Sequence, residues 1–123
     1  MLAAWIVVVV FALLALFQLA LVLGAPWGAF AWGGQVEVLP PSLRVGSACS
    51  ILLYAAFAVV VLDRAGEIDV LSDAAASIGA WVVFGFSAVG VLVNAVSRSK
   101  PERYTMTPVC LVLAVASFVV ATG

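Results

Sequence analysis

Four long apolar runs dominate the sequence and decide what kind of structure it can form. They cover residues 2–23, 43–62, 74–96 and 107–122. Because an α-helix rises 1.5 Å per residue, about 20 mostly apolar residues cross the hydrocarbon core of a bilayer. The whole chain is 67% hydrophobic and 9% charged, whereas soluble domains carry about 25% charged residues. We therefore predict an all-α integral membrane four-helix bundle that forms a single domain over residues 1–123.

Turn and capping residues between the runs place the predicted helix ends. The second run follows Pro-Pro-Ser at residues 40–42, and proline is tolerated in a first helical turn because the amides there have no partner within the helix. Ser72 or Asp73 is the expected N-cap of the third run. Thr107 is the expected N-cap of the fourth, with Pro108 in its first turn.

Basic residues predict the orientation of the bundle. Four spans place loops 24–42 and 97–106 on one side, and loop 63–73 and both termini on the other. The first side carries Arg44, Arg98, Lys100 and Arg103, and the second carries Arg64. Lysine and arginine are retained in cytoplasmic loops. We therefore expect a multi-pass protein of the cell (plasma or inner) membrane, with loops 24–42 and 97–106 in the cytoplasm and loop 63–73 and the termini outside.

Polar side chains gather in the predicted cytoplasmic half of the bundle. Gln18 lies near the end of the first run and Asn94 near the end of the third, while Ser47 and Ser50 lie in the first turns of the second. A polar side chain in hydrocarbon requires a partner, so Gln18 and Asn94 should face the bundle interior or each other. Two interpretations stay open: an interhelical hydrogen bond that fixes the packing, or the lining of a polar pocket for a head group or small solute.

The loop 24–42 has the composition of ordered, irregular backbone. It combines glycines, which permit positive φ and close approach, with Trp27 and Trp32. Tryptophan favours the membrane interface, so the loop could be an aromatic anchor. The alternative is a lid over the polar cluster, with Gln35 and Glu37 as polar contacts.

The basic loop 97–106 either serves orientation alone or attracts anionic lipid head groups, at about 1 kcal/mol per basic residue. A variant of the first interpretation pairs Arg98 or Arg103 with Glu37 or Glu102. The resulting candidate ligand-binding residues are Gln18, Trp27, Trp32, Gln35, Glu37, Asn94, Arg98 and Arg103.

Several classes of site have no support in the residues. The chain contains no histidine, and Cys49 and Cys110 are far apart with no CxxC spacing, so we expect no metal site, no cofactor and no catalytic residues. A net charge of -1 argues against nucleic acid. Small residues such as Gly46 and Gly79 are compatible with close helix packing or self-association. Expected partners are therefore the lipid bilayer, anionic head groups, and a second copy or another membrane protein.

Two segments together carry a resemblance: PWGAFAWGGQVEVLPPSLR (26–44) and NAVSRSKPERYTMTPV (94–109). They resemble a family of short four-span hypothetical membrane proteins of bacteria, especially of the actinobacterial type. The resemblance covers essentially the whole chain and implies four spans and a membrane location. It implies no activity, cofactor or catalytic residue. Small multidrug exporters fit less well, because they need a glutamate in the first helix where this chain has only Gln18.

Three functions remain in competition at this stage. The chain could be a non-enzymatic accessory, interaction or assembly subunit, which the lack of a catalytic constellation favours. It could instead be a carrier, channel or binder of a small or lipid-like ligand in the cytoplasmic half. An enzyme acting on lipid is the least supported, because no nucleophile lies beside a base.

Overall fold

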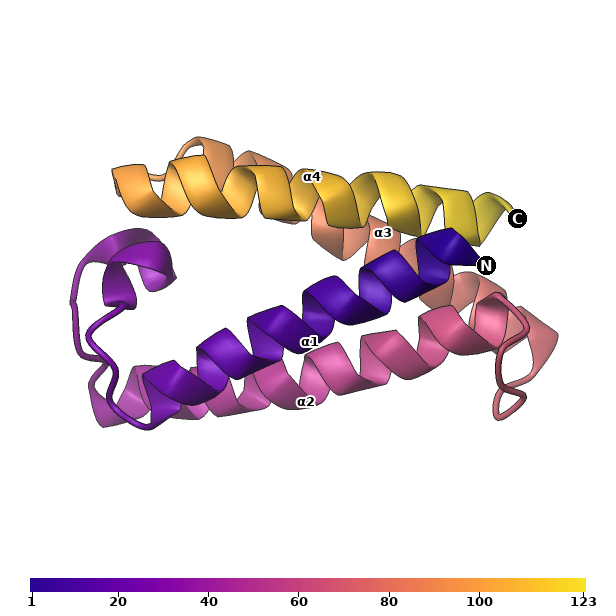
Figure 1. Ribbon diagram of the computed structural model, residues 1–123, viewed down its shortest axis with the longest axis horizontal. Helices are drawn as coiled ribbons and strands as arrows, with labels where there is room; N and C mark the ends of the chain where they lie inside the picture. The colour runs from indigo at the N-terminus through magenta and orange to yellow at the C-terminus, as the bar shows by residue number, and fades with distance from the viewer.

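The computed structural model describes all 123 residues and contains four long helices, joined by short connections and one longer, partly helical one (Figure 1). The helices are α1 (Leu2–Val22), α2 (Pro41–Arg64), α3 (Asp73–Ala95) and α4 (Lys100–Thr122), and two 3-10 turns, η1 (Gly28–Phe30) and η2 (Trp32–Gly34), lie between α1 and α2. Each long helix is long and apolar enough to cross a membrane. The predicted all-α four-helix architecture is confirmed, and these helices indicate a multi-pass membrane protein.

The helix ends agree with the predictions in three cases and differ in the fourth. Ser72 is the N-cap of α3, where its hydroxyl accepts the amide of Ala75 at 3.2 Å. The predicted start of the fourth helix at Thr107 is wrong, because α4 begins at Lys100 and Pro108 lies inside it. Pro101 occupies the first turn of α4, where its missing N–H costs nothing, and a membrane helix tolerates an internal proline. The α3–α4 connection therefore shrinks to residues 96–99.

The helices alternate in direction, so both chain termini and the α2–α3 connection lie at one end of the bundle (Figure 1). The α1–α2 and α3–α4 connections lie at the other end, which we call the loop-one end after residues 23–40. Helix α1 packs mainly against α2, and α3 mainly against α4. These two pairs meet along α1–α4 and α2–α3.

The closely packed core lies away from the loop-one end. It is centred on Phe11, whose ring stacks on Tyr54 at 5.3 Å and meets Phe57 at 5.6 Å. Val7, Val61 and the other buried members of this cluster are aliphatic or small. Large apolar side chains also cover the outer surface of every helix, as expected where the surrounding medium is lipid.

The α2–α3 connection is held by charged groups. The buried carboxylate of Asp63 accepts the amides of Val70 and Leu71, both at 2.7 Å. The terminal ammonium of Met1 donates to Glu67 at 2.7 Å, and this hydrogen bond lowers the pKa of the Glu67 carboxyl. This end of the bundle is thus closed by short local bonds.

Candidate ligand-binding pocket

The α1–α2 connection folds back over the loop-one end, where η1 and η2 lie between α4 and the α1–α2 pair (Figure 1). Gly28 donates its amide to the carbonyl of Glu37 at 2.8 Å, and a Cβ on Gly28 would collide with the carbonyl oxygen of Val36. Gly33 and Gly34 have φ values of 77° and 69°, a region that glycine enters without steric cost. The connection is therefore ordered irregular backbone, as its composition predicts.

Trp32 fastens this segment to α2. Its indole N–H donates to the hydroxyl of fully buried Ser47 at 3.0 Å. Its six-membered ring lies over Gly46, where a Cβ would come within 2.8 Å of the ring. Trp32 itself has φ of 54°, which is uncommon for a residue with a side chain. The contacts with α2 therefore hold Trp32 in a strained backbone conformation.

The start of α4 holds the same segment from the other side. The hydroxyl of Ser99 donates to the carbonyl of Ala29, and Glu102 accepts the amide of Gly33 at 2.9 Å. The spacing Ser99-x-x-Glu102 is that of a capping box, in which both side chains bond their own helix. Here they bond the α1–α2 connection instead, and Glu102 is only 5% exposed.

The predicted pairing of Arg98 or Arg103 with Glu37 or Glu102 is wrong. The only salt bridge joins Met1 and Glu67. Neighbouring helix positions point about 100° apart, so Glu102 faces inward while Arg103 turns to the carbonyl of Ser97 at 3.3 Å. The basic side chains of this loop are left on the surface.

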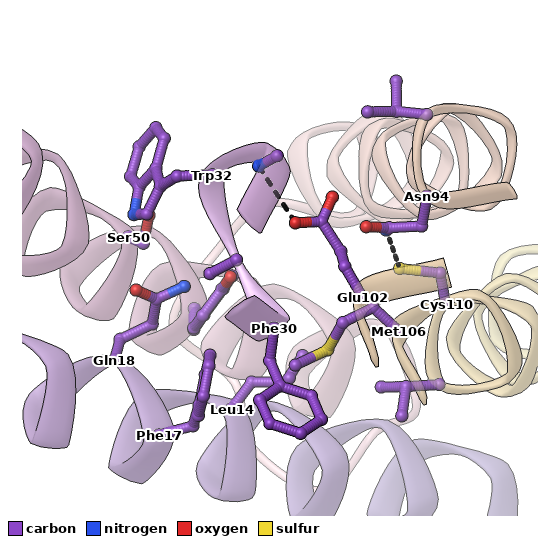
Figure 2. A pocket seen from close by; sticks show the side chains of 15 residues that line it. Leu14, Phe17, Gln18, Phe30, Trp32, Ser50, Asn94, Glu102, Met106 and Cys110 are labelled. Carbon is purple, nitrogen blue, oxygen red and sulfur yellow. Dashed lines mark hydrogen bonds between the residues drawn. The ribbon is translucent and has the colours of Figure 1, made fainter. Parts of the chain in front are cut away.

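A cavity of about 290 Å³ lies under this segment, lined by 15 residues of which 10 are hydrophobic. All four helices and both 3-10 turns contribute, so the cavity is a partly open space between the two helix pairs and the folded-back connection (Figure 2). Its polar lining includes Gln18, Ser50, Tyr54, Asn94 and Glu102.

Gln18 and Asn94 both face this cavity, as predicted, but they do not bond each other. Asn94 donates its amide protons to the carbonyl of Gly90 at 2.8 Å and to the sulfur of Cys110 at 3.3 Å. Gln18 is 8% exposed, and its Oε1 is buried without any hydrogen-bond partner. The amide nitrogen of Asn94 is therefore bonded inside the protein, whereas the carbonyl oxygen of Gln18 is not.

Other candidate residues lie outside the cavity. Of the eight named from the sequence, Gln18, Trp32 and Asn94 line it, and the remaining five, which lie on the surface or elsewhere at this end, are Trp27, Gln35, Glu37, Arg98 and Arg103. Trp27 borders a separate, shallower groove with Phe30 and Met106, which is consistent with an interfacial anchor.

Two cavity residues were missed in the sequence interpretation. Glu102 was considered only as a partner for Arg98 or Arg103 in loop 97–106, although the capping-box spacing is typical of the first turn of a helix. Tyr54 was not singled out, although it follows Ser50 by four residues and positions four apart share one helix face.

Two further grooves lie on the outside of the bundle, one between α3 and α4 and one between α1 and α4. Every residue that lines them is hydrophobic. They offer no polar group that could orient a ligand, and surrounding acyl chains account for them. In contrast to these two grooves, the cavity under the folded-back connection combines apolar walls with polar groups from several helices.

Comparison of the chain with known protein families, with curated proteins and with solved structures finds no match. The resemblance to short bacterial four-span proteins stays a prediction.

Proposed function

We propose that this chain is a non-enzymatic membrane protein that binds a small amphipathic, lipid-like ligand in the cavity at the loop-one end. The observation that carries the proposal is the amide of Gln18, which is buried at the cavity wall with an unpartnered carbonyl oxygen. An unsatisfied buried polar group costs about 1–3 kcal/mol. Rotation of the Gln18 side chain toward the cavity would let a ligand donate a hydrogen bond to Oε1 and recover this cost.

The size and lining of the cavity support a small ligand. Pockets for drug-sized ligands have volumes of roughly 300–1,000 Å³, so 290 Å³ suits a small molecule or the head of a longer one. The cavity is mostly apolar, with polar groups from several helices. The competing hypothesis, an accessory or assembly subunit, rests on the exposed apolar helix faces, and lipid alone accounts for those faces.

Binding is tested on protein purified in dodecyl maltoside micelles, with 1-octanol as the probe and empty micelles as the baseline. We expect saturable binding that the double variant Gln18→Leu/Asn94→Leu abolishes. Gln35→Leu is the matched control, because it makes the same chemical change at an exposed position outside the cavity. If the double variant binds the probe as well as the wild type does, or if the wild type binds no more than empty micelles, the proposal fails.

The proposal also places the cavity on the cytoplasmic side, which follows from the excess of basic residues at the loop-one end. With Cys49 and Cys110 replaced by serine, a cysteine at Ser72 should react with a membrane-impermeant maleimide on intact cells. A cysteine at Val96 should stay protected until the cells are opened. Val96 is preferred to Ser99 because it is 79% exposed and uncharged, whereas Ser99 is bonded to the α1–α2 connection. The reverse labelling pattern would show the opposite orientation.

A further inference from the structure

We propose that the ligand of this cavity carries an ammonium group and that Glu102 is its counter-ion. The ammonium belongs either to a free alkylamine or to the amine head group of a lipid. This inference rests on the proposed function, since it names the chemistry of the ligand that the same cavity takes.

Glu102 is a buried carboxylate without a cation. It is 5% exposed, and no lysine or arginine forms a salt bridge with it. A carboxylate removed from water is normally paired with a cation or heavily hydrogen-bonded. The structure gives Glu102 one hydrogen bond, from the amide of Gly33, and the α4 N-terminus adds a partial positive charge. Glu102 lines the cavity, so a cation bound there would lie beside its carboxylate.

The basic residues of the chain are engaged or exposed elsewhere. Arg44 donates to the carbonyl of Leu39 at 2.8 Å, and Arg64 donates to the carbonyl of Ala121 at the opposite end of the bundle. None of the five basic side chains lines the cavity. A cation paired with Glu102 would therefore come from outside the chain.

Most hydrogen-bond donors around the cavity are occupied within the protein, the exceptions being the Tyr54 hydroxyl and the amide nitrogen of Gln18, which are neighbours. The indole N–H of Trp32 donates to Ser47, and the hydroxyl of Ser50 donates to the carbonyl of Gly46. The amide protons of Asn94 are donated to the carbonyl of Gly90 and the sulfur of Cys110.

In contrast, some hydrogen-bond acceptors of the cavity-lining residues have no partner. They are the second oxygen of Glu102 and Oδ1 of Asn94, with Oε1 of Gln18 buried in the wall behind them. An alkylammonium group offers three donors and a positive charge, so it can pair with the Glu102 carboxylate and still donate to a neutral acceptor of the cavity. An anionic ligand would instead meet a like charge.

Aromatic side chains complete a site suited to an amine with an apolar tail. The rings of Phe17, Phe30, Trp32 and Tyr54 all line the cavity, and Figure 2 shows Phe17, Phe30 and Trp32 around the space that Gln18 and Glu102 border. Aromatic faces attract cations by about 0.5–2 kcal/mol, more when water is excluded. The same faces provide contact for an alkyl chain.

Glu102 also has a structural role, because it holds η2 through Gly33. The variant Glu102→Gln separates the two roles. Glutamine keeps an oxygen that can accept the Gly33 amide, but it removes the negative charge. Glu37→Gln is the matched control, since Glu37 is exposed and outside the cavity.

The test compares three eight-carbon probes in dodecyl maltoside: octylammonium, 1-octanol and octanoate, each corrected for empty micelles. We expect octylammonium to bind more tightly than 1-octanol and octanoate to bind least. Glu102→Gln should weaken octylammonium binding by at least about tenfold, which is about 1.4 kcal/mol, and should leave 1-octanol binding within about twofold. Glu37→Gln should bind all three probes as the wild type does.

A second arm identifies the source of the amine. Native mass spectrometry of protein mixed with equal amounts of phosphatidylethanolamine and phosphatidylglycerol should show preferential retention of the former if the ligand is a lipid, and Glu102→Gln should remove this preference. Binding of octylammonium without lipid preference assigns the site to a free amine.

Two results would overturn the inference: octylammonium binding that Glu102→Gln leaves unchanged, or octanoate binding as tightly as octylammonium. In either case, 1-octanol binding that depends on Gln18 would leave the proposed function intact. If no probe binds in a Gln18-dependent way, both proposals fail.

Discussion

Replacing Gly46 with alanine should loosen the folded-back connection that roofs the cavity. The added Cβ would lie 2.8 Å from the ring of Trp32, so the ring must move and its 3.0 Å bond to Ser47 is lost. A buried hydroxyl left without its partner costs about 1–3 kcal/mol. The strained φ of Trp32 also disfavours the conformation in which its ring lies over Gly46. Since 1.4 kcal/mol is a factor of ten in an equilibrium, local opening should become about 5- to 150-fold more frequent. Hydrogen exchange measured by mass spectrometry over residues 28–37 should accelerate accordingly.

Gly85→Ala is the control for this experiment. Gly85 also lies in a long helix, but nothing stands within 4 Å of its added Cβ. Alanine in a helix interior is favoured over glycine by about 0.5–1 kcal/mol, so this variant should keep wild-type exchange over residues 28–37 and should be no less stable to heat. Wild-type exchange in Gly46→Ala, or equal acceleration in both variants, would refute the role assigned to Trp32.

Two further predictions concern the rest of the bundle. Leu113→Ala should destabilise the protein by about 2–5 kcal/mol in reversible unfolding, because Leu113 is 2% exposed in the core. Leu111→Ala, on the 53% exposed outer face of the same helix, should change the free energy of unfolding far less. Equal losses in the two variants would mean that the core is misplaced. Asp63→Ala should lower the unfolding midpoint and speed hydrogen exchange in the α2–α3 connection, because it removes the acceptor of two backbone amides at a cost of about 1–3 kcal/mol. The control Asp69→Ala, at an exposed position, should leave both quantities unchanged. A similar effect of the two substitutions would contradict this.

The number of long helices and their alternating direction could be predicted, because both follow from the lengths of the apolar runs and from the turn residues between them. The start of α4 could not, because hydropathy marks where a helix enters hydrocarbon and not where its backbone becomes helical. Lys100 and Glu102 are polar but form helix well, so α4 continues beyond its apolar part. Pro108 was interpreted as a helix start, although Pro101 fits that position equally well and is the one that occupies it.

Small residues could be recognised as sites of close approach, but their partners could not. Gly46 was interpreted as a contact between helices, whereas the group that lies over it is the ring of Trp32 from the connection. Gly79 does lie against a neighbouring helix, where a Cβ would meet Val60. A glycine in a membrane helix indicates that another part of the protein packs closely against it. Which part that is depends on the path of the chain in three dimensions.

The cavity could be predicted only in part, for the same reason. Gln18 and Asn94 pointed to one end of the bundle because each stands alone in an apolar run. Glu102 stands among charged residues, so nothing in the sequence distinguishes it from a solvated side chain. It becomes buried because the connection folds back onto the start of α4 and takes both capping-box side chains for itself. The folding-back of this connection thus creates the cavity roof and, by removing Glu102 from water, the charge that the cavity presents to a ligand. Under the proposed function, the fold of the connection and the ligand preference are coupled, and variants that release the connection, such as Gly46→Ala, should weaken octylammonium binding together with the protection of residues 28–37.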